Sequence, residues 1–138
     1  MDKQIKFFKL NQEYSLPDVK LGDSIEELKS SGILIAARSD DSVKFIYAKN
    51  ENILIGNEAS VINQIWFTRL SGCNIFDIDP YAFPYPAIEP ITEYFAQEHQ
   101  QIKDVNNFVE LKLYGIGYYL ALIFSNYMPN HIILSKNN

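Results

Sequence analysis

The first half of the chain has one stretch with a helical pattern, followed by short stretches that alternate between apolar and polar residues. Ser24 followed by Glu27 forms a capping box, which predicts a helix over Ser24–Ser31, and Asp23 is an alternative N-cap. Gly32 suits the left-handed geometry that often ends a helix. Four strands are expected next, over Ile33–Ala37, Val43–Ala48, Ile53–Gly56 and Val61–Leu70. Because the turns between them are short, neighbouring strands should pair antiparallel.

Strict alternation in the last of these strands places its apolar residues on both faces. Ile62 and Trp66 are expected on one face, and Ile65 and Phe67 on the other. The first half is therefore predicted to be a helix followed by a β meander.

The second half repeats this order of elements. Pro90 suits the first position of a helix, which the polar and apolar spacing predicts to run to Lys103. Tyr118–Phe124 is almost wholly apolar, so it is expected to be a central strand covered on both faces. The strands of this half are predicted over Phe108–Leu113, Gly117–Phe124 and His131–Leu134.

These elements predict an α+β fold with a single domain over residues 1–138. The expected architecture is one curled antiparallel sheet of about six to eight strands, with two principal helices packed on it. The length of 138 residues is that of one domain with one core. The two halves either duplicate one unit or together complete one sheet.

Charge is distributed unevenly, and the segment Leu70–Ile102 is where the imbalance lies; we call it the acidic segment. It contains no lysine or arginine and five carboxylates. The remaining twelve acidic residues (seventeen minus five) balance the twelve basic ones, so the net charge of -5 comes from this segment. It also holds four of the six prolines, which predict a stiff, extended loop over Asp79–Pro90.

A stiff loop that carries both carboxylates and aromatic rings is suited to binding a basic protein, because it loses little entropy on binding. The alternative interpretation is a connection whose aromatic rings pack on the body of the protein and whose acids are only solvated. The candidate partner-binding residues are Asp77, Asp79, Tyr81, Phe83, Tyr85 and Glu89.

Other function classes have little support in the sequence. The acidic balance argues against direct nucleic-acid binding, and no apolar run is long enough to span a membrane. One cysteine, Cys73, excludes an intrachain disulfide and favours a cytoplasmic location. No cofactor, metal or small-molecule motif occurs. An enzyme is not expected, although a small hydrolase using Asp77 and Asp79, or Cys73, stays an alternative.

In its size, acidity, α+β pattern and concentrated acidic-aromatic segment, the chain resembles bacterial immunity proteins of the contact-dependent growth inhibition and colicin types. The resemblance implies a non-enzymatic cytoplasmic protein that binds a basic toxin, most often a nuclease, and occludes its active site. An accessory module of a larger cytosolic assembly is a further alternative. The stretch Leu21–Leu28, with Gly32 behind it, is also similar to the helix opening of lipoprotein and β-lactamase-inhibitor modules, which implies a helix-plus-antiparallel-sheet fold.

Overall fold

One antiparallel sheet of eight strands organises the protein. The computed structural model describes residues 18–36, 45–72, 78–85, 87–93, 95, 97–115 and 117–136. The strands are β1 (Leu34–Ala36), β2 (Phe45–Tyr47), β3 (Ile53–Glu58), β4 (Val61–Phe67), β5 (Gln100–Val105), β6 (Phe108–Tyr114), β7 (Tyr118–Ser125) and β8 (Met128–Lys136). The helices are α2 (Ile25–Ser30), α3 (Glu89–Thr92) and the short 3₁₀ turns Arg69–Ser71, Pro80–Ala82 and Gln97–His99. The predicted α+β class is confirmed.

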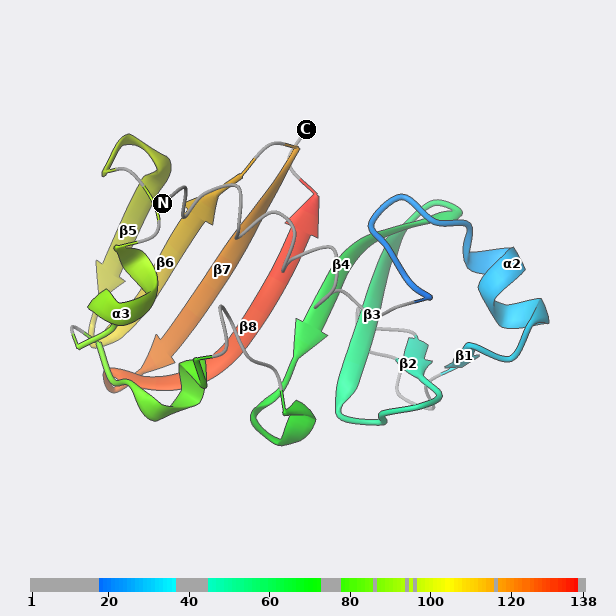
Figure 1. Ribbon diagram of the computed structural model, residues 1–138, viewed down its shortest axis with the longest axis horizontal. Coiled ribbons are helices and arrows are strands. Elements are labelled where there is room, and N and C mark those ends of the chain that lie inside the picture. Colours follow the sequence, from blue (N-terminus) through cyan, green and yellow to red (C-terminus); the bar gives the residue numbers. More distant parts are fainter. Residues whose placement is uncertain are drawn as a thin grey trace.

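The strand order is β1-β2-β3-β4-β8-β7-β6-β5, and every neighbouring pair is antiparallel. Two four-stranded meanders therefore meet where β4 pairs with β8, as Figure 1 shows. Of the two alternatives for the halves of the chain, the strands complete one sheet. Residues 68–99 connect β4 in the middle of the sheet to β5 at its edge.

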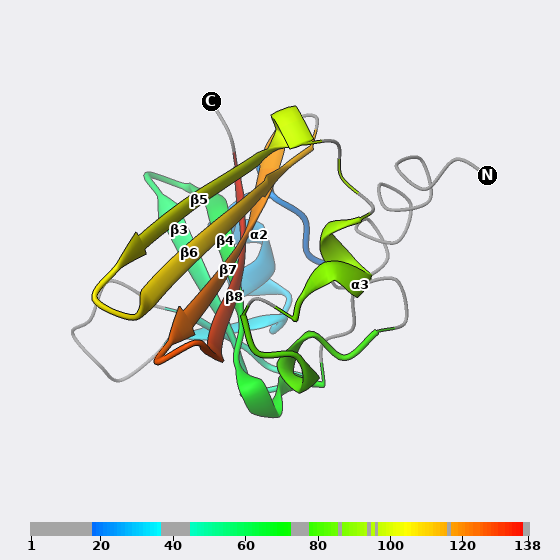
Figure 2. The same ribbon diagram turned by 90° about the vertical axis from the view of Figure 1, so that its left-hand side faces the viewer.

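The core lies on one face of this sheet, which we call the inner face. Its buried residues come from every described strand except β5, and α2 and α3 contribute to the same cluster. Ile25 and Leu28 are the buried residues of α2, and Ile91 is that of α3. Figure 2 shows α3 to one side of strands β5–β8. None of the described helices is long and apolar enough to cross a lipid bilayer.

The start and end of α2 follow from two residues of the predicted pattern. The Ser24 hydroxyl oxygen accepts a hydrogen bond of 3.4 Å from the Glu27 backbone N–H, which satisfies one of the free donors of the first turn. Gly32 follows the helix with a φ of 78°, a left-handed conformation that favours glycine. The predicted Ser24 N-cap and the helix end at Gly32 are both confirmed.

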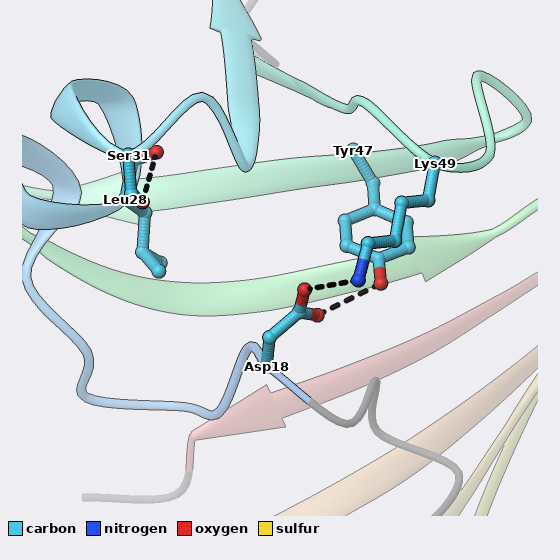
Figure 3. Close-up of polar contacts among 5 residues, drawn as sticks. All are labelled: Asp18, Leu28, Ser31, Tyr47 and Lys49. Atoms are coloured by element: carbon cyan, nitrogen blue, oxygen red, sulfur yellow. Dashed lines mark hydrogen bonds and ion pairs between the residues drawn. The ribbon is translucent and has the colours of Figure 1, made fainter.

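A polar contact joins the segment before α2 to the β2 end of the sheet (Figure 3). The Asp18 carboxylate accepts a hydrogen bond of 2.8 Å from the Tyr47 hydroxyl and one of 2.9 Å from the Lys49 Nζ. Burial acts to raise the pKa of Asp18, but the hydrogen bonds from Lys49 and Tyr47 and the lysine charge outweigh it and lower that pKa. Burial, together with the bond to Asp18 and its negative charge, raises the pKa of Tyr47 to about 12.

A β-bulge in β4 corrects the predicted alternation of that strand. Gly56 pairs with Gln64, whereas its neighbour Asn57 pairs with Ile62, so Asn63 is the extra residue. The extra residue shifts the alternation of side chains between the two faces of the sheet. Ile62 is therefore buried in the same core as Ile65. The prediction that these two isoleucines lie on opposite faces is wrong.

The predicted helix Pro90–Lys103 is wrong beyond its first turn. Pro90 does lie in the first turn of a helix, at its second position, but this helix, α3, begins at Glu89 and ends at Thr92, and Gln100–Val105 forms the edge strand β5. The Gln100 side-chain amide donates to the carbonyl oxygens of Thr92, at 3.2 Å, and Phe95, at 2.9 Å. One side chain thus joins the end of α3 to the start of β5.

The apolar strand Tyr118–Phe124 corresponds to β7, which lies between β6 and β8, so its predicted place in the interior of the sheet is confirmed. Leu120 and Leu122 are buried in the core on the inner face. On the other face Ala121 is buried but Tyr119 and Ile123 are only half-buried. The expected cover on both faces is therefore complete on the inner face and partial on the outer one.

Candidate functional site

The carboxylates of the acidic segment lie at the surface wherever the structure describes them. Asp79 precedes the 3₁₀ turn Pro80–Ala82, Glu89 begins α3, and Glu93 and Glu98 follow that helix. All four are exposed. Asp77, the fifth carboxylate, and Cys73 lie outside the described residues.

Apolar side chains between these carboxylates fix the segment to the protein core. Ile88, Ile91 and Phe95 are buried, and each belongs to the main hydrophobic cluster. Tyr81 is also buried, and its hydroxyl donates to the backbone carbonyl of Phe67 at the end of β4. The exposed acids are therefore carried by backbone that the core holds in place.

Tyr81 is the clearest difference between the predicted partner-binding residues and the structure. Its ring is buried, so its accessible surface is too small for it to anchor a partner. Asp79 supports this arrangement, because its carboxylate accepts a 3.0 Å hydrogen bond from the Tyr81 backbone N–H. Phe83 and Tyr85 are half-buried and pack against the core with one part of their surface. The predicted extended loop also contains the 3₁₀ turn over Pro80–Ala82.

Tyr85 lies beside an aromatic residue that the sequence did not indicate. The Tyr85 ring stacks on Tyr127 with centroids 6.4 Å apart and an angle of 18°, and it contacts buried Phe124 at 5.7 Å. The Tyr85 backbone N–H also donates to the Tyr127 carbonyl at 2.9 Å. Tyr127 is 38% exposed, so a ladder of rings runs from the core to the surface.

The backbone at Tyr127 is unusual for its residue type. Asn126 and Tyr127 form the two-residue turn between β7 and β8, with φ values of 53° and 64°. Such turns favour Asn and Gly, and a bulky residue with positive φ is strained. An aromatic residue between the predicted strands Gly117–Phe124 and His131–Leu134 is the sequence signal that points to this turn.

A basic residue, Arg69, lies next to the start of the acidic segment. Arg69 directly precedes the segment, and its guanidinium lies 5.1 Å from the centre of the Tyr81 ring. Its Nη2 donates to the Pro129 carbonyl at 2.6 Å. Arg69 thus ties the start of the connection to β8 and is held by these contacts.

Metal-binding groups are not brought together in the described ranges. Among those residues, no group of three His, Cys, Asp or Glu side chains could hold a metal ion. Two open hollows of about 380 Å³ lie on the β5–β6 hairpin, and Lys103 and Glu110 line both. Neither hollow is lined by the four exposed carboxylates, so we place the candidate site on the surface formed by the acidic segment and the β7–β8 turn.

Comparison with known proteins identifies a similar fold. No protein-family model and no curated protein matches the sequence. Among solved structures, the chain is similar to YjgB, a DUF4309 family protein from Bacillus subtilis strain 168. The match covers 99% of this chain and 100% of YjgB, with a TM-score of 0.63 and 10% sequence identity. At this identity the likeness shows the fold alone.

Proposed function

We propose that this chain is a non-enzymatic cytoplasmic immunity protein that binds a basic toxin, most simply a nuclease, and occludes its active site. The observation that carries the proposal is the exposure of Asp79, Glu89, Glu93 and Glu98 on a connection that has no lysine or arginine and is anchored in the core. An accessory module that binds a basic component of a cytosolic assembly would use the same surface.

Electrostatics give the reason for choosing a nuclease. The active site of a nuclease is a basic cleft that attracts phosphates, and fixed carboxylates can occupy such a cleft in place of the phosphates. Complementary charge speeds association, to on the order of 10⁸–10⁹ M⁻¹s⁻¹ at low salt. Because the backbone of the acidic segment is held by Ile88, Ile91 and Phe95, little ordering is needed on binding.

Aromatic rings beside the acids supply the apolar part of the proposed interface. Tyr127 and Phe83 replace Tyr81 as the anchor candidates. Tyr85 supports Tyr127, because its ring stacks on the Tyr127 ring and packs against the core. Tyrosine is enriched among residues that dominate binding energy, because it buries a large area and loses few rotamers. In this account the acids set the association rate and Tyr127 sets the dissociation rate.

Affinity capture from the native host tests the proposal. Tagged wild-type protein is compared with Asp79→Asn/Glu89→Gln, in which asparagine can still cap the 3₁₀ turn while the charge is removed. We expect the wild type to retain a basic protein with nuclease activity that added wild-type protein inhibits, and the variant to retain much less of it. A captured nuclease that stays active when bound, or equal capture by both proteins, would argue against the proposal.

A further inference from the structure

The two edges of the sheet differ in length and exposure. β1 at one edge has three residues, whereas β5 at the other has six, and all but the first residue of β5 are exposed. Figure 1 shows β5 as the outermost strand on the left of the sheet. No described strand pairs with its outer side. A long edge strand exposes unpaired N–H and C=O groups that can pair with another strand.

The turn that follows β5 fixes which of its backbone groups point outward. Asn106 and Asn107 have φ values of 53° and 68°, so the β5–β6 hairpin has a two-residue type I′ turn. Val105 and Phe108 next to this turn therefore form a hydrogen-bonded pair. Because such pairs alternate along a ladder, the N–H and C=O groups directed at the free edge belong to Gln100, Ile102 and Asp104.

The side chains of these three residues lie on the inner face of the sheet, where each extends a row of paired side chains on the neighbouring strands. Ile102 pairs with Leu111, Leu111 with Leu122, and Leu122 with Ile132, so a row of apolar side chains crosses the sheet. The other members are buried, but Ile102 at the end of the row is 51% exposed. An apolar residue on the inner face of an additional strand would extend this row.

We propose that β5 pairs antiparallel with β5 of a second copy of this chain, with the two Ile102 residues facing each other across the two-fold axis. Gln100 of one copy then lies opposite Asp104 of the other, and these three pairs use every outward-directed residue of the strand. Three hydrogen-bonded pairs supply six backbone hydrogen bonds. In this register the two isoleucines cover each other.

Other registers that keep the inner faces aligned are less favourable. A shift that centres the pairing on Lys103 places two lysines opposite each other, and it sets Ile102 against Asp104. A shift that centres the pairing on Gln101 sets Asp104 opposite a residue before the start of β5 in the second copy. The outward-directed N–H and C=O groups of Asp104 then have no partner in that strand. The register centred on Ile102 satisfies the backbone and brings no like charges together.

Sedimentation velocity over a concentration series up to about 1 mM, where even weak dimers form, tests this pairing. The wild type should shift from monomer to dimer, whereas Ile102→Lys, which opposes two lysines at the axis, should weaken the dimer at least about 10-fold. Leu70→Lys is the matched control, because Leu70 is 77% exposed and lies outside β5. It should dimerise like the wild type.

A charge-swap mixture tests the register itself. Ile102→Lys and Ile102→Glu should each dimerise more weakly than the wild type when alone, and an equimolar mixture should form more dimer than either variant, because only a two-fold pairing at residue 102 brings the unlike charges together. A wild type that stays monomeric, an Ile102→Lys variant that dimerises normally, or a mixture that remains monomeric would each overturn the proposal. Circular dichroism of the variants confirms that they are folded.

Discussion

The rings of Tyr85 and Tyr127 stack 6.4 Å apart, although 42 positions separate them in the chain. One comes from the acidic segment and the other from the β7–β8 turn, so the stack joins the irregular connection to the sheet. The Tyr85 backbone N–H bonded to the Tyr127 carbonyl holds the same two positions together. We regard this pair as the aromatic part of the candidate site.

Replacement of Tyr127 separates its role in binding from its effect on the fold. Tyr127→Ala and Tyr127→Gly both remove the ring and should raise the dissociation rate of the captured partner, by an energy of about 2 kcal/mol if the ring is a hot spot. They should differ in stability, because glycine relieves the strain of a φ of 64° and alanine does not. Urea unfolding should find Tyr127→Gly more stable than Tyr127→Ala by about 1 kcal/mol. Equal stability of the two variants would contradict the strained turn.

Truncation of a leucine in β7 tests the position of the core. Leu120 is 4% exposed on the inner face, so Leu120→Ala should lower the free energy of unfolding by about 2–5 kcal/mol. Leu70→Ala makes the same chemical change at a residue that is 77% exposed, and it should change stability by less than about 0.5 kcal/mol. Thermal and urea unfolding measure both. Similar losses in the two variants would mean that β7 is not the central buried strand.

The bond between Tyr47 and Asp18 predicts a stability change at alkaline pH. At pH 7, Tyr47→Phe should lose about 0.5–1.5 kcal/mol, the usual net value of a hydrogen bond. The folded protein holds the Tyr47 proton more tightly than the unfolded chain, since folding raises its pKa from 10 to about 12. This contribution is complete below pH 10 and is lost as the pH rises toward 12.

Urea unfolding of wild type and Tyr47→Phe at matched pH values measures this effect, and the titration of the lysines cancels in the difference. The stability gap between the two proteins should narrow from pH 10 upward. A gap that stays constant through this range would show that Tyr47 has no raised pKa.

Local signals in the sequence predicted much of the fold. Ser24, Glu27 and Gly32 act within one short helix, so their roles can be read without knowledge of distant contacts. The antiparallel meanders follow from short turns between apolar runs. The bulge at Asn63 could not be predicted in this way, because it depends on the register of β4 against β3.

The region around β5 shows why the sequence predicts the second helix wrongly. Residues 97–103 are mostly Gln, Glu, His and Lys, which are common on exposed helices and carry no apolar alternation. As an edge strand exposed on both faces, β5 needs no such alternation. Pairing with β6 sets its conformation, and propensity alone cannot show that pairing.

The candidate site was only partly accessible from the sequence. Charge counting located the acidic segment, and Asp79 and Glu89 are exposed as binding would require. The proline pattern could not show that Tyr81 points into the core, because that depends on the Phe67 carbonyl at the end of a distant strand. The proline pattern also could not predict the contact between Tyr85 and Tyr127, because this contact depends on the path of the connection over the sheet.

The central claim is that the exposed carboxylates bind a basic protein, and the association rate with the captured nuclease tests it most directly. We would measure this rate by surface plasmon resonance from about 50 to about 300 mM NaCl, a range over which screening of surface charge grows strongly. Asp79→Asn/Glu89→Gln is compared with Glu51→Gln/Glu58→Gln, which removes two exposed acids outside the segment. We predict that the first variant associates on the order of 10-fold more slowly at low salt, with a flatter salt dependence, and that the control matches the wild type. Equal rates for the wild type and both variants at low salt would contradict the proposed role of the acidic segment.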